Sequence, residues 1–105
     1  MNASQLLSGG DLSANASDGG VSLVQNSRAQ ATGNLDLKGG TTVSLTDASA
    51  EAGGDLTLTG EDGNVTLANS QATGAEDVTV NAGENVTLSG ASTLTATNGA
   101  LDATA

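Results

Sequence analysis

The sequence predicts an all-β protein, a parallel β-helix solenoid with three short strands in each coil of about 22 residues. Three observations lead to this fold class: apolar residues recur with that period, they alternate with polar residues inside short runs, and none of them is aromatic. An interior made of Leu, Val and Ala suits a narrow coil that fills the same cross-section at every turn. With 105 residues we expect a single domain, residues 1–105, of about five coils.

The first strand of each coil starts with an apolar residue, in most coils directly after Asp or Asn, as in DLTL from Asp55. Apolar and polar residues alternate along it, which is typical of a strand with one buried and one wet face. Leu35 and Leu37 illustrate the inward positions, and Asp36 between them points outward. The residues that open the predicted first strands are Leu12, Leu35, Leu56, Val78 and Leu101, at separations of 23, 21, 22 and 23.

The second strand reads Val-x-Leu, with Ser or Thr between the two apolar residues. Val43 and Leu45 are therefore predicted to face inward and Ser44 outward. The inward pairs are Val21 and Leu23, Val43 and Leu45, Val65 and Leu67, and Val86 and Leu88. The outward positions over both strands include Asp36, Ser44, Thr57, Thr66, Thr79 and Thr87.

A weaker third strand is predicted after each Val-x-Leu. Its inward positions are mostly alanine, which implies that the third side of the coil is pinched. The candidates are Ala29, Ala31, Ala50, Ala52, Ala72, Leu94 and Ala96.

Glycine and asparagine are expected at the corners, because both tolerate the left-handed backbone of sharp turns. All fifteen glycines are predicted to lie between strands, those at the corners next to the third strand including Gly33, Gly74 and Gly90. Antiparallel hairpins would also use such turns. Stacked parallel coils are favoured because every third strand carries the same inward residues, whereas hairpins between successive strands would mix them.

Both ends of the chain are predicted to fall in mid-coil. The opening run Ala3–Leu12 aligns with Ala48–Leu56, and the chain stops after a first strand, Leu101–Ala103. We therefore expect a segment of a longer solenoid.

Twelve acidic residues against two basic ones, Arg28 and Lys38, give a net charge of -10. This charge repels phosphate backbones, so no nucleic-acid partner is expected. The chain has no His and no Cys, which leaves few groups for catalysis and none for a thiolate metal site. We predict that it is not an enzyme, with no catalytic, cofactor-binding or metal-ligating residues and no cofactor.

Four patterns suggest chemistry, and each has a simpler structural account. Asp55 and Asp77 are expected to stack one coil apart, but a corner residue that caps its own turn explains each of them. Gly53-Gly54-Asp55 and Gly9-Gly10-Asp11 resemble fragments of a calcium-binding repeat with a different period. The outward rows of Ser and Thr are typical of any solvent-exposed face of a β-sheet. Asn64 above Asn85 predicts a short amide ladder along the axis.

The run GGDLTLTGEDGNVTLANSQATG, from Gly53 to Gly74, resembles the haemagglutinin-type repeats of two-partner-secretion exoproteins, as does DVTVNAGENVTLSGASTLTA from Asp77 to Ala96. That group includes the filamentous haemagglutinins and the contact-dependent growth-inhibition proteins. The resemblance, which extends more loosely over nearly the whole chain, implies a right-handed β-helix and export through an outer-membrane pore. It also implies a rod that carries distal domains.

We therefore expect a structural shaft segment of a secreted bacterial surface fibre, of the adhesin or contact-dependent inhibition type. Its expected partners are neighbouring coils of the parent protein, the secretion pore during export, and a host or neighbouring cell surface. The alternative is a binding module whose hydroxyl-rich or acidic face contacts a glycan, a cation or a host protein.

Overall fold

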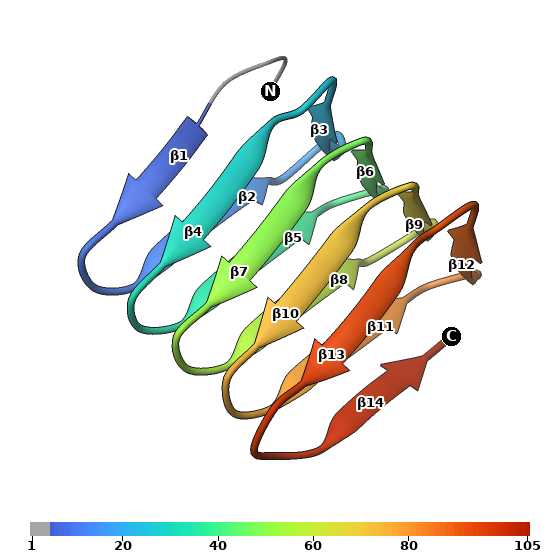
Figure 1. The fold of residues 1–105 in the computed structure, drawn as a ribbon. Coiled ribbons are helices and arrows are strands. Elements are labelled where there is room, and N and C mark those ends of the chain that lie inside the picture. Colours follow the sequence, from blue (N-terminus) through green and yellow to red (C-terminus); the bar gives the residue numbers. More distant parts are fainter. Residues whose placement is uncertain (1–4) are drawn as a thin grey trace.

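The computed structural model describes residues 5–105, which form a parallel β-solenoid of about five turns (Figure 1). Three parallel sheets make its sides, as predicted. The first strands are β2 (Leu12–Ala16), β5 (Leu35–Gly39), β8 (Leu56–Gly60), β11 (Val78–Ala82) and β14 (Leu101–Thr104). The second strands are β3 (Val21–Val24), β6 (Val43–Thr46), β9 (Val65–Ala68) and β12 (Val86–Ser89). The third strands are β1 (Gln5–Ser8), β4 (Arg28–Ala31), β7 (Ser49–Ala52), β10 (Gln71–Gly74) and β13 (Thr93–Ala96).

The coils follow one another from the N-terminal end to the C-terminal end in a right-handed sense (Figure 1). The chain descends along β4, β7, β10 and β13 at the front and returns along β5, β8 and β11 behind them. Within residues 5–105 no helix is present that could cross a membrane.

The predicted period sets the strand register. Leu35 pairs with Leu56 and Leu56 with Val78 between the first strands, and Val43 pairs with Val65 between the second strands. Each equivalent residue therefore lies directly over its counterpart one coil away. Parallel pairing of successive coils is confirmed, and the hairpin alternative is wrong.

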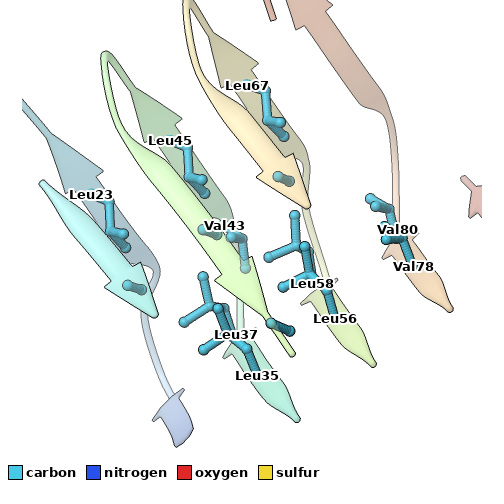
Figure 2. Close-up of a cluster of buried hydrophobic side chains, with 14 of the residues drawn as sticks. Leu23, Leu35, Leu37, Val43, Leu45, Leu56, Leu58, Leu67, Val78 and Val80 are labelled. Carbon is cyan, nitrogen blue, oxygen red and sulfur yellow. The ribbon is translucent and has the colours of Figure 1, made fainter. Parts of the chain in front are cut away.

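The core consists of columns of Leu and Val that run along the axis (Figure 2). Side chains of the first and second strands meet in the interior, where Leu37, Leu45 and Leu58 are fully buried. The outward residues between them keep part of their surface in water, as predicted. In the last coil no further coil covers the Leu and Val columns, so Leu88 is 42% exposed and Leu101 is 49% exposed.

The third side of the coil is pinched, as the alanines predicted. Ala29, Ala50 and Ala72 are fully buried and stack in one column. This column ends in a leucine at each end of the stack, because Leu6 pairs with Ala29 and Leu94 pairs with Ala72. Both leucines are only half-buried, so the larger side chain lies where the coil is not covered on both sides.

The predicted alignment of the opening run needs one correction. It holds at Leu12, which pairs with Leu35. In β1, however, Gln5 lies in the column of Arg28 and Ser49, so it is the equivalent of Ser49. Ala3 and Ser4 lie outside the described residues.

The expected placement and role of the glycines are partly wrong. Gly39, Gly60 and Gly74 are the last residues of their strands, and Gly74 points inward in the column of Ala52. Gly90 is the one glycine among the described residues with a left-handed backbone, at φ 67°. Most corner glycines serve close packing instead: a Cβ on Gly53 would lie 2.1 Å from the backbone oxygen of Thr32 in the coil before.

Candidate functional site

A ladder of side-chain hydrogen bonds runs along the corner that precedes the first strands. Asp11 Oδ1 accepts from the backbone N–H of Asn34 at 2.9 Å, and Asn34 Oδ1 accepts from Asp55 N–H at 2.9 Å. Asp55 Oδ1 accepts from Asp77 N–H at 3.1 Å, and Asp77 Oδ1 from Ala100 N–H at 2.9 Å. We call these four side chains the Asx ladder. The expectation that each residue caps its own turn is wrong, because each one caps the turn of the next coil.

Glycines next to the Asx ladder leave room for its side chains. A Cβ on Gly33 would lie 2.4 Å from Asp11 Oδ1, and one on Gly54 would lie 2.5 Å from Asn34 Oδ1. A Cβ on Gly99 would likewise overlap with Asp77 Oδ1. The Gly-Asx pairs of the sequence therefore work across coils, since the glycine of one coil accommodates the Asp or Asn of the coil before.

Gly54→Ala should lower the free energy of unfolding by about 2 kcal/mol, because the new Cβ displaces Asn34 Oδ1 and leaves Asp55 N–H without its acceptor. Gly10 occupies the equivalent position in the first coil, and a Cβ there meets no atom within 4 Å. Gly10→Ala is therefore the matched control and should change stability by less than about 0.5 kcal/mol. Urea unfolding of both variants measures the difference; equal losses would contradict the role given to Gly54.

The corner before the second strands carries one similar contact, from Asn64 to Asn85. Asn64 Oδ1 accepts from the backbone N–H of Asn85 at 3.0 Å. The predicted stacking of these two residues is therefore confirmed, although the donor is a backbone N–H and not a second side-chain amide.

Serines bridge the coils at the third corner, between the second and third strands. Ser70 Oγ accepts from Ala48 N–H at 3.0 Å and donates to Ala68 O at 2.9 Å. Ser92 Oγ accepts from Ser70 N–H at 3.2 Å. Ser70 is 1% exposed, so its hydroxyl is fully used inside the corner. All three corners thus use polar side chains to bond one coil to the next.

Both cations of the chain pair with a carboxylate one coil further on. Arg28 contacts Glu51 through Nε at 3.0 Å and through one terminal nitrogen at 2.5 Å, and Lys38 Nζ lies 3.4 Å from Glu61 Oε1. The four side chains are 41–51% exposed, so solvent screening limits each pair to at most about 1 kcal/mol. These pairs add cohesion between coils without forming a reactive site.

The residues that the sequence suggested for catalysis or metal binding make contacts in the structure that stabilise the stack of coils. Asp55 and Asp77 do stack, but Asp55 Oδ1 accepts a hydrogen bond from the backbone N–H of Asp77 and so takes part in a structural contact between coils. Gly53-Gly54-Asp55 belongs to the Asx-ladder corner. No group of three or more His, Cys, Asp or Glu that could hold a metal ion occurs in residues 5–105.

The hydroxyl rows form as predicted, and other residues interrupt them. Ser44 pairs with Thr66 and Thr66 with Thr87 on the second sheet, while Asp36 pairs with Thr57 on the first. A mixed row of this kind is an ordinary wet β face.

A groove of about 1070 Å³ crosses several coils along the corner between the second and third strands. Sequence reasoning missed it, because it arises from the backbone path of that corner and not from a motif. The available signal was the Gln, Asn or Asp that follows three of the four second strands in place of glycine. The groove is lined by Gln5, Gln25, Asn26, Ser27, Arg28, Asp47, Ala48, Ser49, Glu51, Asn69, Gln71 and Ala91.

Comparison with known families gives one match, to the model described as "Hemagglutinin repeat", over residues 41–103. This range is more than half of the chain. No match was found among curated proteins or solved structures. The matched repeat is non-catalytic, and no catalytic role is shown for this chain. The chain belongs to the haemagglutinin repeat family, the repeat of filamentous haemagglutinin-type exoproteins.

Proposed function

We propose that this chain is a structural shaft segment of a secreted bacterial surface fibre, in which stacked coils hold distal adhesive or toxic domains away from the cell. Membership of the haemagglutinin repeat family supports export as part of an exoprotein. During export the parent protein would pass through an outer-membrane pore, and its distal part would then meet a host or neighbouring cell.

The observation that carries this proposal is that each coil presents the same columns to the next one. Leu35, Leu56 and Val78 stack in one register, and the Asx ladder runs through the same three coils. A coil contacts mainly its two neighbours, so length can change by whole coils without a change in fold. This property is what a spacer needs and what a catalytic site does not.

Deletion of one whole coil from the parent protein tests the proposal. Removing residues 56–77 joins Asp55 to Val78, which occupies the column of Leu56, so all registers are kept. The fibre should remain folded and exposed on the cell, and it should be shorter by about 4.8 Å, the spacing of adjacent strands. Antibody labelling of intact cells and small-angle scattering of the purified shaft measure these two results.

Deletion of residues 56–66 is the matched control, because it removes half a coil and brings second-strand residues into the first sheet. We expect this variant to misfold and to be lost from the cell surface. If both deletions were equally harmful, or equally harmless, the coil would not be the unit of length and the spacer proposal would fail.

A further inference from the structure

The groove along the corner between the second and third strands has three properties that no other part of residues 5–105 combines. Its volume is about 1070 Å³, ten of its twelve lining residues are polar or charged, and its rim consists of residues with a left-handed backbone. Consecutive coils contribute to it in turn, through Asn26, Asp47 and Asn69. The groove therefore runs along the solenoid axis.

Its rim residues occupy a backbone conformation that favours glycine. Gln25, Asn26, Asp47 and Asn69 have φ between 50° and 66°, and they are the non-glycine residues with positive φ among the described residues. The next coil has Gly90 at this place, at φ 67°. A side chain costs stability in this region of φ, most of all for Gln25. The chain thus keeps polar side chains at a corner where glycine would be more stable.

Most of these side chains are not needed for cohesion. Asn69 bonds to Ala91 N–H through Oδ1, but the side chains of Gln25, Asn26 and Asp47 make no hydrogen bond within residues 5–105. In the Asx ladder, by contrast, every Asp and Asn is bound to the next coil. Gln71, on the neighbouring strand, is exposed beside the rim and also makes no side-chain hydrogen bond there.

We propose that this groove binds a neutral oligosaccharide that lies along the solenoid axis. A side-chain amide offers two N–H donors and an acceptor oxygen, which matches sugar hydroxyls that both donate and accept. The rim groups recur once per coil, at a rise of about 4.8 Å, so a chain of sugar units can meet one of them at each step. This proposal goes beyond the spacer role, and its failure would leave that role untouched.

The charges of the groove favour a neutral sugar over an acidic one. Asp47 and Glu51 line it, Arg28 is already paired with Glu51, and the chain as a whole carries a net charge of -10. An anionic glycan would be repelled by this field. Of the residues that line the groove, only Ala48 and Ala91 are apolar, so it has no pocket for a large apolar side chain of a peptide. Without an aromatic stacking surface, we expect weak binding to one segment and stronger binding to a long glycan that spans many coils.

Titration of the ¹⁵N-labelled chain tests the proposal, with a panel of neutral hexasaccharides (glucans, mannans and galactans) and a hexasaccharide of uronic acids as probes. At least one neutral probe should shift the amide signals of Gln25, Asp47 and Gln71, and the uronic acid probe should leave them unchanged. In the variant that carries both Gln25→Gly and Asp47→Gly, the affinity should fall about tenfold or more, since two hydrogen-bonding side chains are lost.

The same double variant should melt at an equal or higher temperature, because glycine removes the strain of the left-handed corner. A structural role of these residues would instead lower the melting temperature. Asp62→Gly is the control, since it removes one exposed carboxylate at a corner outside the groove and should leave sugar binding unchanged.

Three results would overturn the proposal. The first is that no neutral probe shifts the groove signals. The second is that the uronic acid probe binds more tightly than the neutral ones. The third is that Ca²⁺ shifts the same signals and the sugars do not, which would assign the groove to a cation.

Discussion

Val65→Asp should lower the free energy of unfolding by about 4 kcal/mol or more, because it places a carboxylate without a partner inside the apolar column. Val65 is fully buried in β9, where it stacks between Val43 and Val86. A domain of this size has a total stability of about 5–15 kcal/mol, so the substitution removes a large fraction of it. Urea unfolding followed by circular dichroism measures the loss.

Thr66→Asp is the control for this prediction. Thr66 is the next residue in β9, but it faces outward and is partly exposed. Its change should cost less than about 1 kcal/mol. If the two variants were equally unstable, the assignment of inward and outward positions would be wrong.

Ala50→Leu should lower the free energy of unfolding by about 3 kcal/mol, because the third side of the coil has no room for the larger side chain. Ala50 is fully buried between Ala29 and Ala72. Leucine occurs in this column only at Leu6 and Leu94, where the coil is half-open. Thermal and urea unfolding should agree on the loss.

Thr73→Leu adds a larger apolar side chain to the same sheet, at an outward position of β10. It should change stability by less than about 0.5 kcal/mol. A stabilising effect of Ala50→Leu would show that the third side has unfilled space and is not pinched.

The strands and the core could be predicted from the sequence because each inward residue recurs at nearly the same place in every coil. Leu35, Leu56 and Val78 identify one another as equivalents, and the polar residues between them mark the outward face. The alanines of the third strand indicated the narrow side in the same way. Repetition thus made a weak signal in any one coil reliable over five.

The corners could be predicted only in part, because their conformation depends on contacts between coils. The role of Gly54 follows from Asn34 in the coil before, and no rule about one turn in isolation includes that neighbour. At the groove, Asp47 adopts a positive φ where glycine or asparagine would be the first expectation. The candidate binding surface lies at these irregular positions for the same reason.

Disulfide formation between Thr57→Cys and Thr79→Cys tests the parallel stacking of coils most directly. The two residues are partners in the register of β8 and β11, and the chain contains no other cysteine. Adjacent strands are about 4.8 Å apart, within the range of Cα separations that a disulfide spans. At low protein concentration, mild oxidation should produce an intramolecular bond in nearly all molecules.

The pair Thr59→Cys and Thr66→Cys is the control. These two residues lie in two different sheets and should stay reduced, whereas in an antiparallel hairpin they would face each other. Rapid bonding of the second pair, with none of the first, would contradict the solenoid.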